Sequence, residues 1–189
     1  WVPRNSLGIE AFRIGGHDYM YFGPWPSLLR MPAMFLFRPM DGRWTIPSML
    51  LALTIALIGT IRLAWSIRAV VLPDQALRRF ECWFVGIFTA LVAGGSVFLF
   101  LTSQAWVYHE AEIWGAAAAI AAFSIIFDYI RAPRPRLLVL ASIFGAIAIL
   151  SRPSVGFGPL AAIGLVGVAA LTGPTRRLLG LAEPAEGAS

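Results

Sequence analysis

The sequence contains no lysine, so its 15 basic side chains are all arginines. Charged residues are scarce at 13%, whereas hydrophobic residues make up 58% and the mean hydropathy is +0.74. An ordinary soluble domain contains about twice this fraction of charged residues. The scarcity of charge therefore argues against a soluble helical bundle and indicates an integral membrane protein.

Other absences narrow the chemistry. The single cysteine, Cys82, cannot form an internal disulfide, and we expect it to be a small buried apolar residue. The chain has no metal-ligand spacing, no Gly-rich nucleotide loop and no Gly-x-Ser-x-Gly elbow, so no metal site and no cofactor are evident, and dependence on a divalent metal stays open. The net charge of +5 comes from arginines scattered over loop ends. We therefore expect no nucleic-acid partner.

Long apolar stretches dominate what is present. They predict helices at 46–66, 82–104, 111–130, 137–151 and 154–172. A helix that crosses a bilayer needs roughly 20 apolar residues; the 137–151 run is short for this purpose. The predicted fold is all-α: a polytopic integral membrane bundle of five helices over 46–175, preceded by an extracytoplasmic loop with a short interfacial helix.

The arginines alternate with these stretches along the chain. They cluster at three places: Arg62, Arg68, Arg78 and Arg79; Arg131, Arg134 and Arg136; and Arg176 with Arg177. The intervening connections at 105–110 and 151–154 contain only Arg152. Cytoplasmic loops of membrane proteins are enriched in basic residues. We therefore predict a multi-pass protein of the plasma (inner) membrane, with an extracytoplasmic functional face and a cytoplasmic tail at 176–189.

Residues 1–45 are expected to form an extracytoplasmic loop, because their glycines and prolines prevent a long helix. The apolar stretch Trp25–Phe37 is too short to span a bilayer. With Arg30 and Arg38 beside it, this stretch predicts a helix lying in the plane of the membrane interface. The chain begins with Trp1 and not with Met, and we expect it to be a fragment of a longer protein with at least one helix upstream.

Ionisable residues gather where the 111–130 helix begins, at His109, Glu110 and Glu112. A carboxylate there either complements the helix dipole or faces a partner or a wet cavity. The two glutamates are two positions apart and point to nearly opposite sides. We favour Glu112 as the functional one, because it lies further into the apolar run.

Arg152 is the one arginine in the short outer connections. It is either an interfacial anchor or a side chain that holds an anion, which would be a phosphate or one of the Glu carboxylates. In the first loop, a polar cluster precedes the Gly23-Pro24 turn. Its members, His17, Asp18, Tyr19 and Tyr21, either belong to the same site or form a polar loop over the bundle.

Four segments resemble motifs of the type C membrane glycosyltransferases, the superfamily of protein O-mannosyltransferases and aminoarabinose transferases. Gly16–Leu29 (GHDYMYFGPWPSLL) is similar to G-x-x-Y-x-x-K-P-P-L. The segments Trp44–Leu50, Leu101–Gln104 and Ile149–Phe157 are similar to R-L-P-S-A-L, L-T-S-P and L-L-T-K-G-P-V-G-L. All four occur in the family's order and spacing, although Gly23 and Arg152 replace the two family lysines.

The resemblance implies transfer of a sugar from a polyprenyl-phosphate donor to an acceptor at the outer face of the membrane. The bundle would hold the isoprenoid chain, a carboxylate would deprotonate the acceptor, and Arg152 would neutralise the donor phosphate. The family's catalytic carboxylate would lie upstream of Trp1, so this fragment alone is expected to be inactive. The candidates implied here are His109, Glu110 and Glu112 in support of catalysis, and Arg152, Tyr19, Tyr21, Asp18 and His17 in substrate binding.

Two other hypotheses remain open. A transporter or flippase-like bundle would line its path with Arg152 and the glutamates, although these charges gather at one face and not at the midplane. A non-catalytic membrane scaffold would use the Gly/Ala-rich stretch 115–122 as a helix-packing face.

Overall fold

The computed structural model describes residues 12–14, 17–19, 23–36, 44–72, 75–103 and 106–171. Within these ranges it contains seven helices and one antiparallel hairpin of two three-residue strands. The strands are β1 (Phe12–Ile14) and β2 (His17–Tyr19). The helices are α1 (Trp25–Leu36), α2 (Thr45–Val71), α3 (Arg79–Gly94), α4 (Val97–Ser103), α5 (Val107–Arg131), α6 (Pro135–Ser151) and α7 (Pro153–Leu171).

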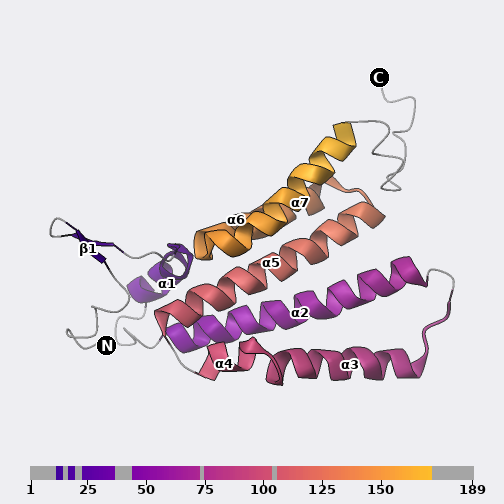
Figure 1. The fold of residues 1–189 in the computed structure, drawn as a ribbon, viewed down its shortest axis with the longest axis horizontal. Coiled ribbons are helices and arrows are strands. Elements are labelled where there is room, and N and C mark those ends of the chain that lie inside the picture. The colour runs from indigo at the N-terminus through magenta and orange to yellow at the C-terminus, as the bar shows by residue number, and fades with distance from the viewer. Residues whose placement is uncertain are drawn as a thin grey trace.

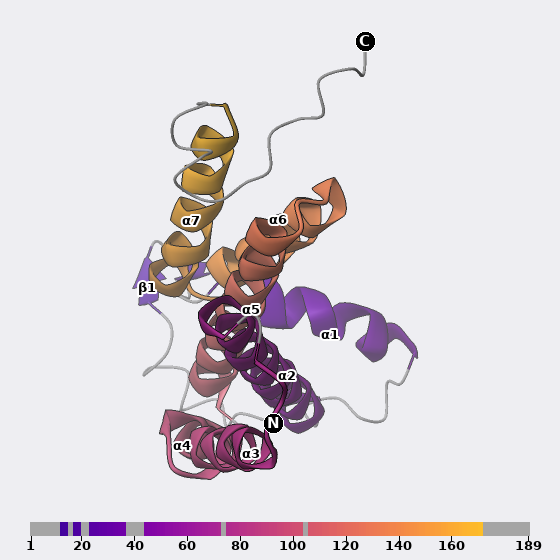
Figure 2. The same ribbon diagram turned by 90° about the vertical axis from the view of Figure 1, so that its right-hand side faces the viewer.

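Helix α5 is the centre of the bundle. It packs against α2 on one side and against α6 and α7 on the other. Helix α3 lies on the outer side of α2, and α4 contacts both α2 and α5 (Figure 1). Helix α1 runs across one end of the bundle, as the two perpendicular views show together (Figure 2). This orientation is the one expected of the predicted interfacial helix over Trp25–Phe37.

Small residues allow the helices around α5 to approach closely. Within the Gly/Ala-rich stretch 115–122, Ala117, Ala118 and Ala122 are buried. On α2, a Cβ added to Gly59 would lie 3.0 Å from Ile120 Cγ2. Close backbone approach through small side chains is the usual packing mode of membrane helices. The stretch 115–122 is therefore a helix-packing face.

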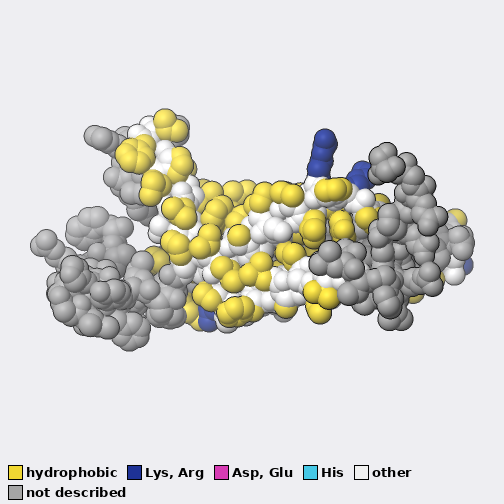
Figure 3. All heavy atoms as spheres, turned by 90° about the horizontal axis from the view of Figure 1, so that it is seen from above, with side chains coloured by type: hydrophobic (Ala, Val, Ile, Leu, Met, Phe, Trp, Pro, Cys, Tyr) yellow, Lys and Arg dark blue, Asp and Glu magenta, His cyan; other side chains and the backbone are white. Residues whose placement is uncertain are grey.

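Two helices, α2 and α5, are long and apolar enough to cross a membrane, or three if α3 and α4 form one bent span. Helices α6 and α7 are apolar but shorter. On the face seen in Figure 3, apolar side chains cover the length of the helices and only isolated basic side chains interrupt them. These features support a membrane protein, with two or three of the five predicted spans meeting the length requirement.

The predicted continuous helix over 82–104 is wrong, because the chain bends by 44° between α3 and α4. The break falls at Gly94-Gly95-Ser96, and Gly/Ser pairs are a common cause of sharp kinks. Gly95 closes α3 by donating its N–H to the Leu91 carbonyl oxygen (2.7 Å). The Ser96 hydroxyl then accepts the N–H of Phe98 (3.2 Å), which caps the start of α4.

The predicted helical class is confirmed, and the small β1–β2 hairpin is an addition to it that the sequence did not predict. One smaller expectation needs correction. Cys82 was predicted to be buried but is exposed on α3. The reason is that α3 buries none of its residues against the rest of the described chain.

The arginine distribution yields a test of orientation. In a Cys82→Ala background, Ser103→Cys should react with a membrane-impermeant maleimide added outside intact cells. Gln75→Cys should react only after permeabilisation, because it lies at the arginine-rich end; both side chains are exposed. Labelling is read by gel shift, with the cysteine-free protein as the control. The reverse pattern would invert the predicted topology.

Candidate functional site

Ionisable side chains meet at the end of the bundle where α5 begins. Trp106 is extended, α5 begins at Val107, and Glu110 lies in its first turn, where a carboxylate complements the helix dipole. The end of α6, the start of α7, the start of α2 and helix α1 all lie at this same end (Figure 1). Glu110 and Glu112 each form an ion pair with an arginine from a different part of the chain.

Glu110 forms an ion pair with Arg30 of α1, with 3.0 Å between Glu110 Oε2 and Arg30 Nη2. The Glu110 side chain is completely buried, and that of Arg30 is 19% exposed. The guanidinium also donates from Nη1 to the Thr45 hydroxyl (3.1 Å) and from Nε to the Pro26 carbonyl oxygen (3.1 Å). One arginine therefore joins α1, the start of α2 and the start of α5.

Aromatic side chains enclose this buried pair. Trp114 donates its indole N–H to the buried Ser48 hydroxyl (2.9 Å), which also lies beside the Glu110 carboxylate. The Trp25 ring packs edge-on against Trp114, with 5.7 Å between the ring centroids. The Trp25 indole nitrogen is buried without a hydrogen-bond partner among the described residues. The surroundings of Glu110 thus leave this carboxylate no access to solvent, and Arg30 is its charged partner.

Glu112 forms the second ion pair, with Arg152. Arg152 ends α6 in an extended conformation and is followed directly by Pro153, the first residue of α7. Its guanidinium carbon lies 5.1 Å from the centre of the Tyr108 ring, a cation–π geometry. The Arg152 and Glu112 side chains are 33% and 21% exposed. Unlike the Arg30–Glu110 pair, this pair can be reached by a ligand.

A glycine allows α5 to pass close beneath Arg152. A Cβ added to Gly115 would lie 3.2 Å from Arg152 Cβ, which is tighter than an ordinary contact. The side chain of Arg152 is thereby held against the first turns of α5, where Glu112 can reach it.

His109 is buried among aromatic rings. Its ring stacks on Trp106 at an interplanar angle of 24° and contacts Phe100 of α4 and Tyr108. Tyr108 therefore touches both His109 and Arg152. This packing attaches the start of α5 to α4 and gives His109 a structural place beside the second ion pair.

The segment after the hairpin docks on the α6–α7 junction. Gly23 donates its N–H to the Ser151 carbonyl oxygen (3.2 Å), and a Cβ at Gly23 would lie only 1.7 Å from the Leu150 carbonyl oxygen. Only glycine fits this contact. His17, Asp18 and Tyr19 belong to β2, whose side chains are outside the described part, and Tyr21 lies outside the described residues.

The structure places the predicted residues as follows. Arg152 pairs with Glu112, one of the two kinds of anion that the sequence left open. Glu112, which was favoured because it lies further into the apolar run, is partly exposed, whereas Glu110 is fully buried. Arg30 was predicted only to flank the interfacial helix, and its pairing with Glu110 was not predicted. A lone arginine within an apolar helix requires a partner, and this requirement is the sequence signal that could have identified its role.

Comparison with protein families, with curated proteins and with solved structures gave no match to this chain. Among the described residues, no three His, Cys, Asp or Glu side chains are grouped so that they could hold a metal ion. The function proposed below is therefore argued from the geometry and from the resemblance of short segments.

Removing the buried carboxylate should be costly. We expect Glu110→Ala to lower the free energy of unfolding by about 3–5 kcal/mol, because it leaves a largely buried guanidinium unpaired. The double variant Arg30→Met/Glu110→Leu should recover most of this loss. Unfolding by SDS in mixed micelles measures the stability of the single and the double variant. Arg62→Ala is the control, because the Arg62 side chain is 56% exposed and its pair with Asp128 should contribute under about 1 kcal/mol. A loss below about 1 kcal/mol for Glu110→Ala would contradict the buried pair.

The Gly23 contact yields a second stability test. Gly23→Ala should destabilise the protein by about 1–3 kcal/mol, the usual cost of overpacking, because its methyl group cannot share space with the Leu150 carbonyl. The matched control is Gly164→Ala in α7, where an added Cβ meets no atom within 4 Å. That change should be neutral or slightly stabilising, as Ala favours helix over Gly. Equal thermal stability of the two variants would mean that the segment does not dock on α6.

Proposed function

We propose that this chain is part of an integral membrane glycosyltransferase that uses a polyprenyl-phosphate sugar donor. In this proposal the chain is a multi-pass protein of the inner membrane, and the end that carries Arg30, Glu110, Glu112 and Arg152 faces outward. Support comes from the order of the four motif-like segments along the chain. The apolar faces of the bundle suit an isoprenoid chain, which must remain within the bilayer.

The observation that carries the proposal is the contact between Gly23 and Ser151. These residues belong to two segments that resemble separate motifs and lie far apart in the sequence. If both segments serve one donor site, they have to meet in space. Their meeting beside Arg152, the more exposed of the two described arginines at this end (33% against 19% for Arg30), is what a shared site requires.

In this proposal Arg152 acts on the leaving group. When the bond between the sugar and the donor phosphate breaks, negative charge develops on the phosphate oxygens, and a guanidinium already held in place stabilises that charge. Glu112 and Tyr108 position the guanidinium before the donor arrives. The proton of the acceptor hydroxyl passes to a carboxylate.

The two glutamates take different roles. Glu110 is a positioning residue, because it is buried, paired with Arg30 and closed to any acceptor. Glu112 is the carboxylate that an acceptor could approach once the donor phosphate engages Arg152. Glu112 would support the catalytic base that the family resemblance implies. His109 holds the start of α5 in place.

Transport is the weaker alternative on this geometry. The residues that would line a path, Arg152, Glu110 and Glu112, lie together at one end of the long helices, and the Arg68–Glu81 pair lies at the other. The pair Arg62–Asp128 joins the last turn of α5 to the second half of α2. A transporter of charged solutes places its binding groups near the bilayer midplane.

Arg152 provides the test. We expect Arg152→Lys to retain partial transfer, because a point charge still neutralises phosphate without the bidentate fork. Arg152→Ala should lower kcat by about 10²–10³-fold, the usual loss when a preorganised group facing developing charge is removed. The assay uses the complete gene product and measures the release of polyprenyl phosphate from a polyprenyl-phosphate sugar.

Two controls make this result specific. Protein level and membrane insertion should be unchanged in both variants, because Arg152 is at a helix end. Arg62→Ala, which removes an arginine from the second half of α2, should transfer sugar at the wild-type rate. Near-wild-type transfer by Arg152→Ala would make Arg152 an interfacial anchor and remove it from the donor site.

A further inference from the structure

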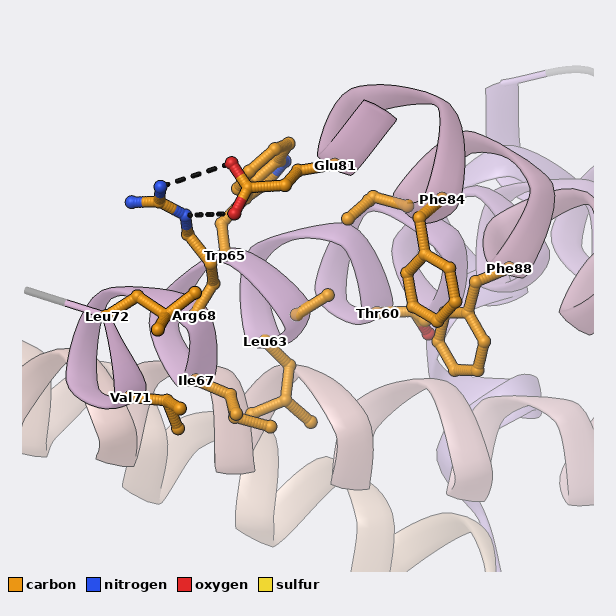
Figure 4. Close-up of a pocket in the computed structure, with 12 residues that line it drawn as sticks. Thr60, Leu63, Trp65, Ile67, Arg68, Val71, Leu72, Glu81, Phe84 and Phe88 are labelled. Carbon is orange, nitrogen blue, oxygen red and sulfur yellow. Dashed lines mark hydrogen bonds and ion pairs between the residues drawn. The ribbon is translucent and has the colours of Figure 1, made fainter. Parts of the chain in front are cut away.

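A groove lies between α2 and α3, at the end of the bundle opposite to the Arg152–Glu112 pair. Its volume is about 510 Å³, and Figure 4 shows side chains from both helices lining it. The lining residues on α2 run from Thr60 to Leu72, a rise of roughly 18 Å at 1.5 Å per residue. Half of a hydrocarbon core of about 30 Å is about 15 Å. The groove therefore has the length of one leaflet.

The wall of the groove is apolar. It includes Phe84 and Phe88, whose rings lie side by side, and Trp65, whose ring lies beside the Glu81 carboxylate (Figure 4). Thr60 is the one hydroxyl in the wall, and it already donates to the Ala56 carbonyl oxygen of its own helix (2.8 Å). The hydroxyl of the wall is therefore already engaged, and the two charged lining residues, Arg68 and Glu81, pair with each other at the mouth.

The mouth of the groove carries an excess of positive charge. Arg68 closes it by donating to Glu81, with Nε 3.3 Å from Oε1 and Nη2 3.1 Å from Oε2. Glu81 also accepts the backbone N–H of Arg78 (2.8 Å), so this carboxylate is fully engaged. The guanidinium groups of Arg78 and Arg79 are exposed and form no ion pair within the described residues. Arg78 and Arg79 stand at the start of α3, in the same turn as Glu81, so three arginines and one glutamate occur at this end of the groove.

We propose that this groove holds one acyl chain of an anionic phospholipid, with the lipid phosphate bound by Arg78 and Arg79. In a bilayer, a side-opening apolar slot is filled by hydrocarbon, and van der Waals packing along the slot retains one chain. The unpaired arginines select the headgroup, because basic residues near the membrane surface attract anionic lipids. The proposal rests on the insertion of α2 and α3 in a membrane and not on sugar transfer.

The size of the groove favours a lipid chain over a protein segment. A helix about 10–12 Å in diameter occupies roughly 400–600 Å³ for each 5.4 Å turn. The groove therefore accommodates the volume of about one helical turn, although it extends over roughly 18 Å of α2. A long and narrow slot of this kind suits an extended hydrocarbon chain.

Trp65 and Trp83 form a matched pair of reporters for the test. Trp65 lines the groove, whereas Trp83 does not line it and is 73% exposed on α3. The protein is reconstituted in phosphatidylcholine vesicles that contain phosphatidylglycerol with brominated acyl chains, which quench tryptophan fluorescence on contact. Brominated phosphatidylcholine at the same mole fraction gives the background of lipids that merely surround the protein.

We expect brominated phosphatidylglycerol to quench more fluorescence than brominated phosphatidylcholine does. This excess should vanish in Trp65→Phe and persist in Trp83→Phe. Filling the groove with Ala64→Phe should also abolish the excess, whereas Ala90→Phe, on a surface of α3 outside the groove, should not. Arg78→Gln and Arg79→Gln should each raise the half-saturating mole fraction about fivefold, which corresponds to ~1 kcal/mol.

Two results would overturn the proposal. Equal quenching of Trp65 by both brominated lipids would mean that no anionic lipid is selected. Weaker quenching of Trp65 than of Trp83 in every mixture would mean that a protein segment or a second copy of the chain fills the groove. Circular dichroism of each variant confirms that the helices are retained.

Discussion

The arrangement of the α5 end depends on the cost of burying a carboxylate. Glu110 is fully buried at the start of an apolar helix, and an unpaired charge there would be more expensive than the whole fold can tolerate. Arg30 meets that requirement, and its remaining donors bind Thr45 and the Pro26 carbonyl. The need to neutralise one side chain therefore fixes three elements relative to one another. Helix α1 would otherwise present only a short apolar stretch, with Pro32 in its middle, to the bundle.

Small residues on α5 supply the second constraint. The glycine and alanines of 115–122 allow α2, α6 and α7 to approach one helix from several sides, and Gly115 lets Arg152 lie directly against it. The reach of Arg152 to Glu112 is thus a consequence of backbone packing. A larger side chain at 115 would move the α6–α7 junction and with it the charge that the proposed donor site depends on.

Much of this architecture was predictable from the sequence. Apolar length predicted the helices from 46 onward to within a few residues at most ends, and the short Trp25–Phe37 stretch predicted a helix that α1 confirms. The pairing and burial of the charged side chains were less predictable. Periodicity shows that Glu110 and Glu112 point to different sides, but it does not reveal which arginine meets each of them, because Arg30 and Arg152 arrive from distant segments. The burial of Glu110 depends on how α1 covers the end of the bundle, and the kink at Gly95 depends on a cap formed by Ser96.

The described arginines at the two ends of the bundle differ in how they are paired. At the α5 start, each described arginine is paired with a glutamate, and the more exposed pair is the one where a phosphate can exchange for a carboxylate. At the α3 start, Arg68 satisfies Glu81 and leaves Arg78 and Arg79 facing outward beside an apolar groove. A ligand that binds an arginine already paired with a glutamate has to replace that glutamate. Only a ligand with a stronger interaction can do so, and the ion pair therefore makes binding selective. Unpaired arginines at a membrane surface give standing attraction to whichever anionic headgroup is abundant. In the two proposals made above, arginine serves turnover at one end of the bundle and lipid anchoring at the other, and the difference lies in how many carboxylates the fold brings to each.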